Sequence, residues 1–391
     1  MAAEVTGTTI ASAPSAQTWR QDRDGFPHIA VAGTPEEIGA QHGELLRSEI
    51  QDMLAALSHH VLNGKGGMLG QLVRPAILAL ARLMEPRIDA RYKREMAALA
   101  RAADASYSDV LLLNCLDDIL ANLRLPGEIF ARWACSGFGT WSDASPTGDL
   151  LCGRNLDYYV WSADGEDPWV ATNYMKAHVV TITYQPTDKP AFVSVGWPGF
   201  IGAPTALNAN GVTVNALTVS TRWNWPFATP ATFIYRDIAE SAATLGDAIG
   251  ILRRAARSQG NNVLLGSGAE RRAVVVEFTP WKLSVREPTG NSIATTNHFQ
   301  HSDTARASHY ISPGSLARMQ RLDHLASELE GREAAMECLL DTMKPADPQA
   351  ADFPIYNACT IYSVLFEPAR GRLWVRPADT PERAFQEVTL P

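Results

Sequence analysis

The 391-residue chain lacks most of the short motifs that identify a function directly. It contains no CxxC pair, no GxGxxG fingerprint, no GxxxxGK[ST] loop and no GxSxG elbow. These absences exclude paired zinc or redox cysteines, the usual dinucleotide and phosphate loops, and the nucleophile turn of α/β-hydrolases. The papain-like CGSCW signature is also missing. Any chemistry must therefore come from polar residues that are scattered along the chain.

Cysteine is scarce and occurs in an odd number. The five cysteines are far apart in the sequence: Cys115, Cys135, Cys152, Cys338 and Cys359. This pattern predicts free thiols in a reducing compartment, and hence a cytoplasmic protein. His298 and His301 are three residues apart, but their turn-like setting favours a structural role over metal binding. We expect neither a metal site nor a cofactor.

A cluster of basic residues and a long hydrophobic run are also missing. The net charge is −8, which argues against nucleic acid or an anionic membrane surface as the main partner. The most apolar stretch, residues 191–207, contains Pro198 and Pro204 and is shorter than the roughly 20 residues of a membrane-spanning helix. Residues 1–19 are small and polar and do not resemble a signal peptide. We therefore expect a soluble protein without a membrane span.

Residues 1–134 are expected to be mostly helical. Thr34 is a good N-cap, Pro35 suits the first helical position, and Glu37 completes a capping box. The apolar residues that follow recur at helical spacing, interrupted by Gly39 and Gly43, whose bare backbone allows close packing. Further helical windows continue this pattern up to residue 122.

The hydrophobic period changes after residue 135. Nine short segments are rich in β-branched and aromatic residues, and each is bounded by Gly, Pro, Asn or Asp, which is typical of strands. Two helical windows, residues 232–257 and 315–343, interrupt them. Many strands with grouped helices predict an α+β fold built in layers.

The densest polar stretch lies at this change of period. Cys135 is followed by small residues, a turn-like SPTGD, and then Arg154 and Asp157 on the expected return strand. Such a hairpin brings a cation and an anion beside the thiol, provided that they lie at a strand end or a bend, since regular alternation separates them. A thiolate is stabilised in this way. A buried Arg–Asp pair that merely fixes the hairpin explains the pattern equally well.

The residues CSGFGTWSDASPTGDLLCGRNLDY (135–158) resemble the mature N-terminus of N-terminal-nucleophile (Ntn) hydrolases related to acyl-coenzyme A:6-aminopenicillanic acid acyltransferase. The segments GTPEEIGAQHGELLRSEI, ALNANGVTVNALTVS, TTNHF and SLARMQRL resemble further motifs of that family, in the same order. Acid ceramidase-like amidases share the GRNLDY element, and penicillin V and bile-salt amidases are more distantly similar. The resemblance implies a four-layer αββα sandwich that is preceded by a helical segment.

The resemblance also implies a precursor that cuts its own chain between Ala134 and Cys135. Residues 1–134 then become one subunit and residues 135–391, the catalytic region, become the other, and the two remain associated. The freed α-amine of Cys135 has a reference pKa of about 7.7 to 8.0, which lets it act as the base for its own thiol. No catalytic histidine is then needed.

The family motifs assign roles to further residues. By resemblance, Arg154 stabilises charge near the sulfur and Asp157 holds the amine. Asn208 and Asn297 match the positions that donate to the oxyanion, although either residue also suits a turn or a loop cap. Arg318 matches a further active-site arginine, and Arg321, one turn later, competes for that match.

Aromatic residues after the motif suggest an apolar acyl pocket, formed by Tyr158, Trp161, Trp223 and Trp225. Bracing of loops over a sheet is an equal alternative. We expect a small-molecule substrate, an N-acyl amide cleaved through a Cys135 thioester. The alternatives are an acyltransferase that moves an acyl group from a thioester or amide to an amine, and an idle member that only binds. Assembly into homo-oligomers is left open.

Overall fold

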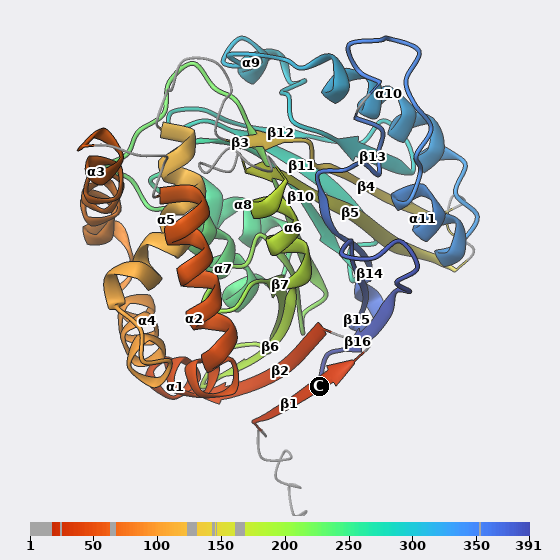
Figure 1. Cartoon of the computed structure of the whole chain (residues 1–391). Helices are drawn as coiled ribbons and strands as arrows, with labels where there is room; N and C mark the ends of the chain where they lie inside the picture. Colours follow the sequence, from red (N-terminus) through yellow and green to blue (C-terminus); the bar gives the residue numbers. More distant parts are fainter. Residues whose placement is uncertain are drawn as a thin grey trace, which may run out of the picture.

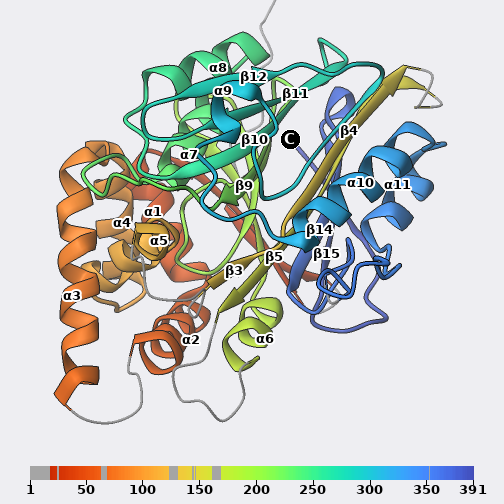
Figure 2. The same cartoon turned by 90° about the horizontal axis from the view of Figure 1, so that it is seen from above.

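Two β-sheets face each other at the centre of the computed structural model (Figures 1 and 2). The structure describes residues 18–23, 26–62, 68–122, 131–142, 145, 147–160, 169–351 and 353–391. The first sheet has nine strands in the order β1 (Trp19–Arg23), β2 (Phe26–Gly33), β6 (Val180–Pro186), β7 (Phe192–Gly196), β8 (Thr205–Asn208), β9 (Val212–Val219), β10 (Gly260–Ser267), β11 (Arg272–Phe278) and β12 (Leu283–Arg286).

The second sheet lies against the first and contains residue 135, where the hydrophobic period of the sequence changes. Its order is β13 (Ser292–Thr295), β4 (Ser136–Ser142), β5 (Gly148–Val160), β14 (Thr360–Glu367), β15 (Arg372–Pro377) and β16 (Gln386–Thr389). The short strand β3 (Ala131–Trp133) also pairs with β5. β3 and β4 therefore flank Cys135, and both are antiparallel to the same strand.

Helices cover the outer faces of both sheets (Figure 2). On the side of the first sheet are α1 (Pro35–Leu45), α2 (Arg47–Ala56), the π-helical turn Leu57–Leu62, α3 (Met68–Met84), α4 (Ala90–Ala102), α5 (Tyr107–Asn122), α7 (Ala231–Ser241) and α8 (Leu245–Arg254). On the side of the second sheet are α10 (Pro313–Ser327) and α11 (Arg332–Leu339). Two shorter helices are α6 (Val170–Ala177), which contacts β5 and β14, and α9 (Ser302–Ala305), which contacts β12.

Three buried hydrophobic clusters correspond to the three contacts between these four layers. One joins the first sheet to its helices, for example Val214 with Ile234. The second fills the space between the sheets, where Leu264 and Val364 both belong to it. The third joins the second sheet to α10 and α11. The α+β, four-layer αββα prediction is confirmed.

The N-terminal helices form as their sequence predicts. Thr34 caps α1 in a complete capping box with Glu37. A Cβ atom at Gly39 would lie 2.1 Å from the carbonyl oxygen of Glu95 in α4, and one at Gly43 would lie 2.5 Å from that of Leu99. Only glycine lets the two helices approach this closely, so the glycines bring α1 and α4 together.

The structure also contains strands that the helical expectation for residues 1–134 omitted. β2 pairs in parallel with β6, and β1 covers the outer edge of β2. β2 is buried along almost its whole length, so its residues do not alternate between apolar and polar. This segment is therefore joined to the first sheet by backbone hydrogen bonds. Among the residues that the structure describes, no helix is long and apolar enough to cross a membrane.

Candidate functional site

Cys135 lies at the start of the β4–β5 hairpin and is buried. Ser136 pairs with Asn155, so the return strand passes directly beside the thiol. The Nη2 atom of Arg154 lies 3.5 Å from Cys135 Sγ, and the backbone oxygen of Asp157 lies 3.5 Å from the same sulfur. The hairpin thus brings the three residues together, as the sequence predicted.

Arg154 and Asp157 lie on opposite faces of β5. The Arg154 guanidinium points toward the first sheet, where Nη1 donates to Thr205 Oγ1 (2.7 Å) and to the Pro204 carbonyl (3.1 Å). The register of β14 shifts between Thr360 and Tyr362, opposite the Asp157 end of β5. The extra residue lies in β14, whereas Trp133–Tyr158 and Ser136–Asn155 keep one register along β5, so the bend expected beside the thiol is not present in β5 itself.

The Asp157 carboxylate is buried and only partly satisfied. Its Oδ2 accepts a hydrogen bond from Asn357 Nδ2 at 2.7 Å. Its Oδ1 has no hydrogen-bond partner within the described part of the chain. Burial raises the pKa of Asp157 to about 6, although the positive charge of Arg318 opposes this shift. The unpaired oxygen can accept one further donor.

Arg318 extends from α10 to the peptide bond before Cys135. Its Nη1 donates to the carbonyl oxygen of Ala134 and, at 3.0 Å, to that of Cys135. The side chain is fully buried. Arg321 instead forms an ion pair with Asp341 Oδ2 at 2.8 Å. Of the two arginines, the structure thus brings Arg318 to the backbone at Ala134 and Cys135.

The thiol is held in its neutral form by its surroundings. Burial raises the pKa of Cys135 above its usual value, and the nearby Arg154 charge counteracts part of this effect. Deprotonation therefore requires a base close to the sulfur.

Asn297 is held beside Arg318 by three hydrogen bonds. Its Oδ1 accepts from Arg318 Nη2 (3.3 Å), and its Nδ2 donates to the Thr218 carbonyl (2.8 Å). Its backbone N–H donates to Ser315 Oγ (3.0 Å), which also contacts His298 Nδ1 (2.8 Å). Burial lowers the pKa of His298 to about 4, so this ring is neutral and holds the loop.

The prediction that Asn208 belongs to the site is not supported. Its Nδ2 donates to the Ala242 carbonyl, and its Oδ1 accepts from the backbone N–H groups of Asn210 and Val212. These bonds close the β8–β9 turn, whereas Thr205, at the opposite end of β8, is the residue that contacts Arg154. The Asn-x-x-Gly pattern thus describes a turn.

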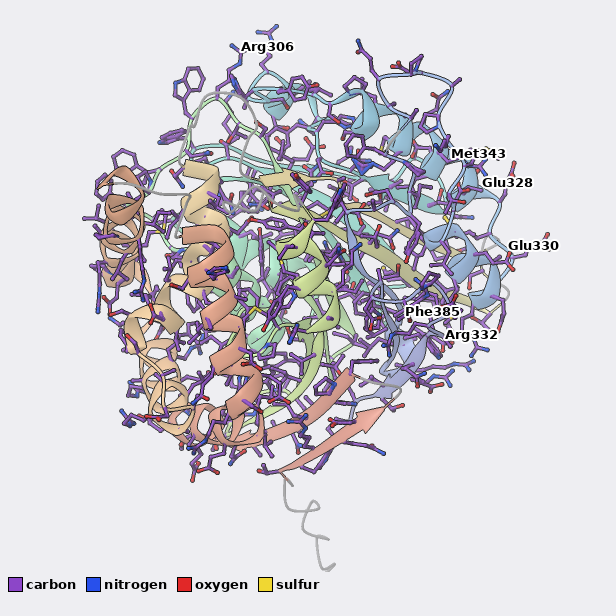
Figure 3. All side chains as sticks on the ribbon, in the orientation of Figure 1. Arg306, Glu328, Glu330, Arg332, Met343 and Phe385 are labelled. Carbon is purple, nitrogen blue, oxygen red and sulfur yellow. The ribbon has the colours of Figure 1, made fainter. Side chains whose placement is uncertain are left out.

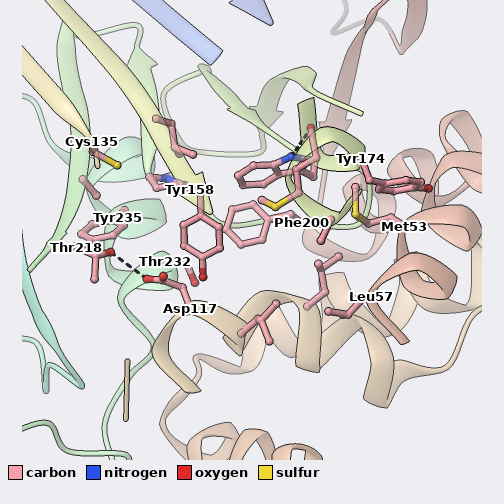
Figure 4. A pocket seen from close by; sticks show the side chains of 18 of the residues that line it. Met53, Leu57, Asp117, Cys135, Tyr158, Tyr174, Phe200, Thr218, Thr232 and Tyr235 are labelled. Carbon is pink, nitrogen blue, oxygen red and sulfur yellow. Dashed lines mark hydrogen bonds between the residues drawn. The ribbon is translucent and has the colours of Figure 1, made fainter. Parts of the chain in front are cut away.

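A pocket of about 150 Å³ opens onto Cys135 (Figure 4). Most of its lining side chains are apolar. They are Met53, Ala56, Leu57, Leu113, Leu116, Asp117, Cys135, Arg154, Leu156, Tyr158, Ala171, Tyr174, Met175, Trp197, Phe200, Pro204, Ala216, Thr218, Thr232, Tyr235 and Asn261. Cys135, Thr218 and Tyr235 lie toward one end, whereas Met53, Leu57 and Tyr174 lie toward the other (Figure 4).

The predicted substrate residues have different positions. Tyr158 lines the pocket. Trp223 and Trp225 do not line it: they are 62% and 47% exposed, on a loop at the surface. That part of the prediction is wrong, because composition does not show which way a loop faces. Trp161 lies outside the described residues.

Sequence reasoning missed Asn261. It lies directly opposite Thr218 in the β9–β10 pair, lines the pocket and is 1% exposed. Its Nδ2 has no hydrogen-bond partner among the described residues, which is unusual for a buried amide. The only signal in the sequence is an Asn–Asn pair directly before an apolar strand. Its neighbour Asn262 is structural, since it donates to two carbonyls of the loop that carries Asn297.

The sequence of this chain is similar to a known protein family and to individual proteins. Residues 148–381 match the family model described as acyl-coenzyme A:6-aminopenicillanic acid acyl-transferase. The acyl-coenzyme A:6-aminopenicillanic-acid-acyltransferase 40 kDa form of Emericella nidulans is 26% identical over 314 residues, which cover 79% of each chain. A protein of Archaeoglobus fulgidus is 27% identical over 278 residues, 66% of this chain. The chain spans less than half of that relative, 44% of its length.

Solved structures give weaker similarities. The Caenorhabditis elegans ortholog of N-acylethanolamine-hydrolyzing acid amidase is 16% identical with a TM-score of 0.44, over 66% of this chain and 100% of that one. Penicillin V acylase from Agrobacterium tumefaciens is 12% identical with a TM-score of 0.41, over 65% and 86% of the two chains.

Proposed function

We propose that this chain, which belongs to the acyl-coenzyme A:6-aminopenicillanic acid acyl-transferase family, acts on amides as an autoproteolytic N-terminal-cysteine amidohydrolase. In this proposal Cys135 first cleaves the bond to Ala134 and then attacks the amide of an N-acyl substrate. Cys135 itself precedes the residues that match the family model, so its role rests on the geometry of the site.

One observation carries the proposal: a buried guanidinium donates to the carbonyl oxygen of the peptide bond that is to be cut. Attack on that carbonyl places negative charge on the Ala134 oxygen, which is the atom that Arg318 contacts. A donor that is already aimed at such an oxygen stabilises the tetrahedral state with no reorganisation. A second guanidinium, Arg154, lies beside the attacking sulfur and favours its thiolate form.

The cleavage chemistry follows from these contacts. The Cys135 sulfur attacks the Ala134 carbonyl carbon, and the thiol proton passes to the Cys135 nitrogen, which is the leaving group. Collapse of the tetrahedral state then breaks the C–N bond, which gives a free amine at Cys135 and leaves the Ala134 acyl group on sulfur as a thioester. Water then hydrolyses the thioester, which gives a carboxylate at Ala134 and restores the thiol.

Asp157 fits the product of this step. The new α-ammonium group at Cys135 carries donors that the peptide nitrogen lacks, and Asp157 Oδ1 is a buried acceptor without a partner in the described structure. Its backbone oxygen already accepts from the N–H of Ala134 (3.2 Å). We infer that Asp157 orients the amine, whose neutral form then takes the proton of the Cys135 thiol. This arrangement supplies the nearby base that the raised pKa of Cys135 requires.

Turnover then requires donors for the oxyanion of the substrate. We assign one to Asn261, whose Nδ2 is buried at the pocket wall without a partner among the described residues. An amide NH₂ group has two hydrogens, so Asn297 also retains one beyond its bond to Thr218. Asn261 therefore replaces Asn208 as the proposed oxyanion donor.

The pocket supports an apolar acyl group. A cavity of similar size lined by apolar side chains holds a benzene molecule in another protein, and the lining beyond Cys135 is mostly apolar here. Met53, Leu57 and Leu113 come from residues before the cleavage site, and Trp197 and Phe200 come from residues after it. Both fragments must therefore stay associated for the pocket to exist.

The acyl-enzyme can react with water or with an amine. The similarity to the Emericella nidulans acyltransferase over 79% of both chains makes transfer to an amine the second candidate. The experiment is release of free acid from a panel of N-acyl amines and acyl thioesters, with and without an added amine. Free acid in the absence of the amine supports the hydrolase, whereas product that forms only with the amine identifies a transferase. No turnover of any donor by the cleaved protein contradicts both.

A further inference from the structure

Exposed aromatic side chains gather on three neighbouring loops at one end of the first sheet. Six large apolar residues there are 38% to 62% exposed: Trp223, Trp225, Phe227, Trp281, Tyr310 and Ile311. We call these six residues the aromatic surface. Of the six exposed aromatic residues in the described parts of the chain, five belong to it, and the sixth is Trp19 in β1. This clustering needs an explanation, because isolated exposed apolar residues are common but such groups mark interaction sites.

Backbone and side-chain bonds hold the three loops together. Trp225 N donates to the Ser258 carbonyl (2.7 Å), and Arg222 N donates to the Ala307 carbonyl (3.0 Å). The Arg257 side chain donates to the Thr279 carbonyl (2.9 Å), which fixes the loop that carries Trp281. Trp225 and Phe227 also pack edge to face, with ring centroids 5.3 Å apart. The six residues therefore belong to one continuous region.

The same region is basic, in a protein whose net charge is −8. Segments 220–229, 253–258, 279–282 and 301–311 contain Arg222, Arg253, Arg254, Arg257, Lys282 and Arg306, and a single acid, Asp303. Arg257 is buried, whereas the other five basic residues are exposed. Arg306 projects away from the molecule beside α9 (Figure 3). Because these residues are scattered in the sequence, only folding produces a basic cluster.

The aromatic surface adjoins the end of the pocket where Cys135, Thr218 and Tyr235 lie (Figure 4). β9 ends one residue after Thr218, which lines the pocket, and the loop with Trp223 follows. Asn224 Nδ2 donates to the Ala121 carbonyl of α5 (2.6 Å), and Asp117 of the same helix also lines the pocket. A molecule held at this surface is therefore near the site of Cys135.

We propose that the aromatic surface docks the protein on an anionic lipid bilayer. Trp and Tyr rings favour the level of the lipid headgroups, where an apolar ring and a polar N–H or O–H are both satisfied. Exposed Arg and Lys beside them attract acidic lipids. The linear sequence contains no basic cluster, which argued against an anionic membrane surface, whereas the folded loops bring the basic residues together. The proposal does not depend on the proposed catalytic function.

Flotation of the full-length protein with vesicles tests this proposal. We expect binding to vesicles of phosphatidylcholine with phosphatidylserine, little binding to phosphatidylcholine alone, and weaker binding as salt is raised. The double variant Trp223→Ala/Trp281→Ala should lose binding, since both side chains are at least 60% exposed and contribute little to the core. Arg306→Gln should weaken binding about fivefold.

Matched controls separate this surface from general adhesion. Trp19→Ala removes an exposed aromatic ring outside the surface, and Arg94→Gln removes an exposed arginine in α4. Neither should change binding. Absence of binding to anionic vesicles at low salt overturns the proposal, as does equal binding by the Trp223→Ala/Trp281→Ala variant. A dimer in light scattering that this variant abolishes also overturns it, because the surface then joins two copies of the chain.

Discussion

Replacement of Arg318 by glutamine should slow the cleavage before Cys135. Arg318 is fully buried, and its Nη1 donates to the carbonyl oxygen that gains the charge. Loss of one donor to an oxyanion typically costs roughly 3 to 4 kcal/mol, which is a rate decrease of about 10²- to 10³-fold. The Arg318 charge also lowers the pKa of the Cys135 thiol, so its removal acts in the same direction.

Cell-free synthesis sampled over time, with intact-mass analysis, measures this rate. Arg321→Gln is the matched control, because it removes an arginine from the same helix and breaks only the pair with Asp341. The control should cleave at the wild-type rate. Arg318→Lys keeps a positive charge and should recover part of the rate, and thermal unfolding of each variant shows whether it folds. Cleavage of Arg318→Gln within a few-fold of the wild-type rate would show that Arg318 does not stabilise this oxyanion.

Three further predictions concern other residues. In Asn261→Ala, kcat for amide hydrolysis should fall about 10²- to 10³-fold, whereas Asn208→Ala, which disturbs only a turn, should keep its kcat; equal kcat values in steady-state assays remove Asn261 from the oxyanion role. Cys152→Ala should still be cleaved and should lose about 0.5 to 3 kcal/mol in urea unfolding, since this thiol is fully buried beside Gly139 and Gly266; an uncleaved Cys152→Ala would contradict this. Burial raises the pKa of Asp118 to about 7, so the folded state retains a proton that the unfolded chain releases, and stability should fall as pH rises from about 4 to 7. Urea unfolding across this range should show a flatter profile for Asp118→Asn, and an unchanged profile would contradict the assignment.

The fold was predictable wherever local patterns and the family motifs agreed. The capping box at Thr34, the glycines that admit α4, and the change of period at residue 135 are all present in the structure. β2 was missed because a strand buried on both faces does not alternate. The helical window at residues 232–257 is two helices, since Thr244 forms a second capping box that starts α8.

The site was predictable only in part, because distant segments build it. The hairpin relation of Cys135, Arg154 and Asp157 is local in sequence, and the structure brings these residues together. The Asn–Asn pair alone did not identify Asn261, because its assignment depends on an amide that has no partner among the described residues of the folded chain. Trp223 was expected in the pocket but lies at the surface. The sequence of a loop does not show whether its aromatic side chains face a pocket or solvent.

Intact mass and N-terminal sequencing of the purified protein detect the proposed cut before Cys135. We expect two associated fragments, one that ends at Ala134 and one that begins with Cys135, and a single uncut, inactive chain for Cys135→Ala. The Cys152→Ala variant serves as the control for removal of a buried thiol and should still be cut. A wild-type chain that stays whole while it hydrolyses amides, or a Cys135→Ala variant that is cut at the same bond, would show that Cys135 does not act by cutting this bond.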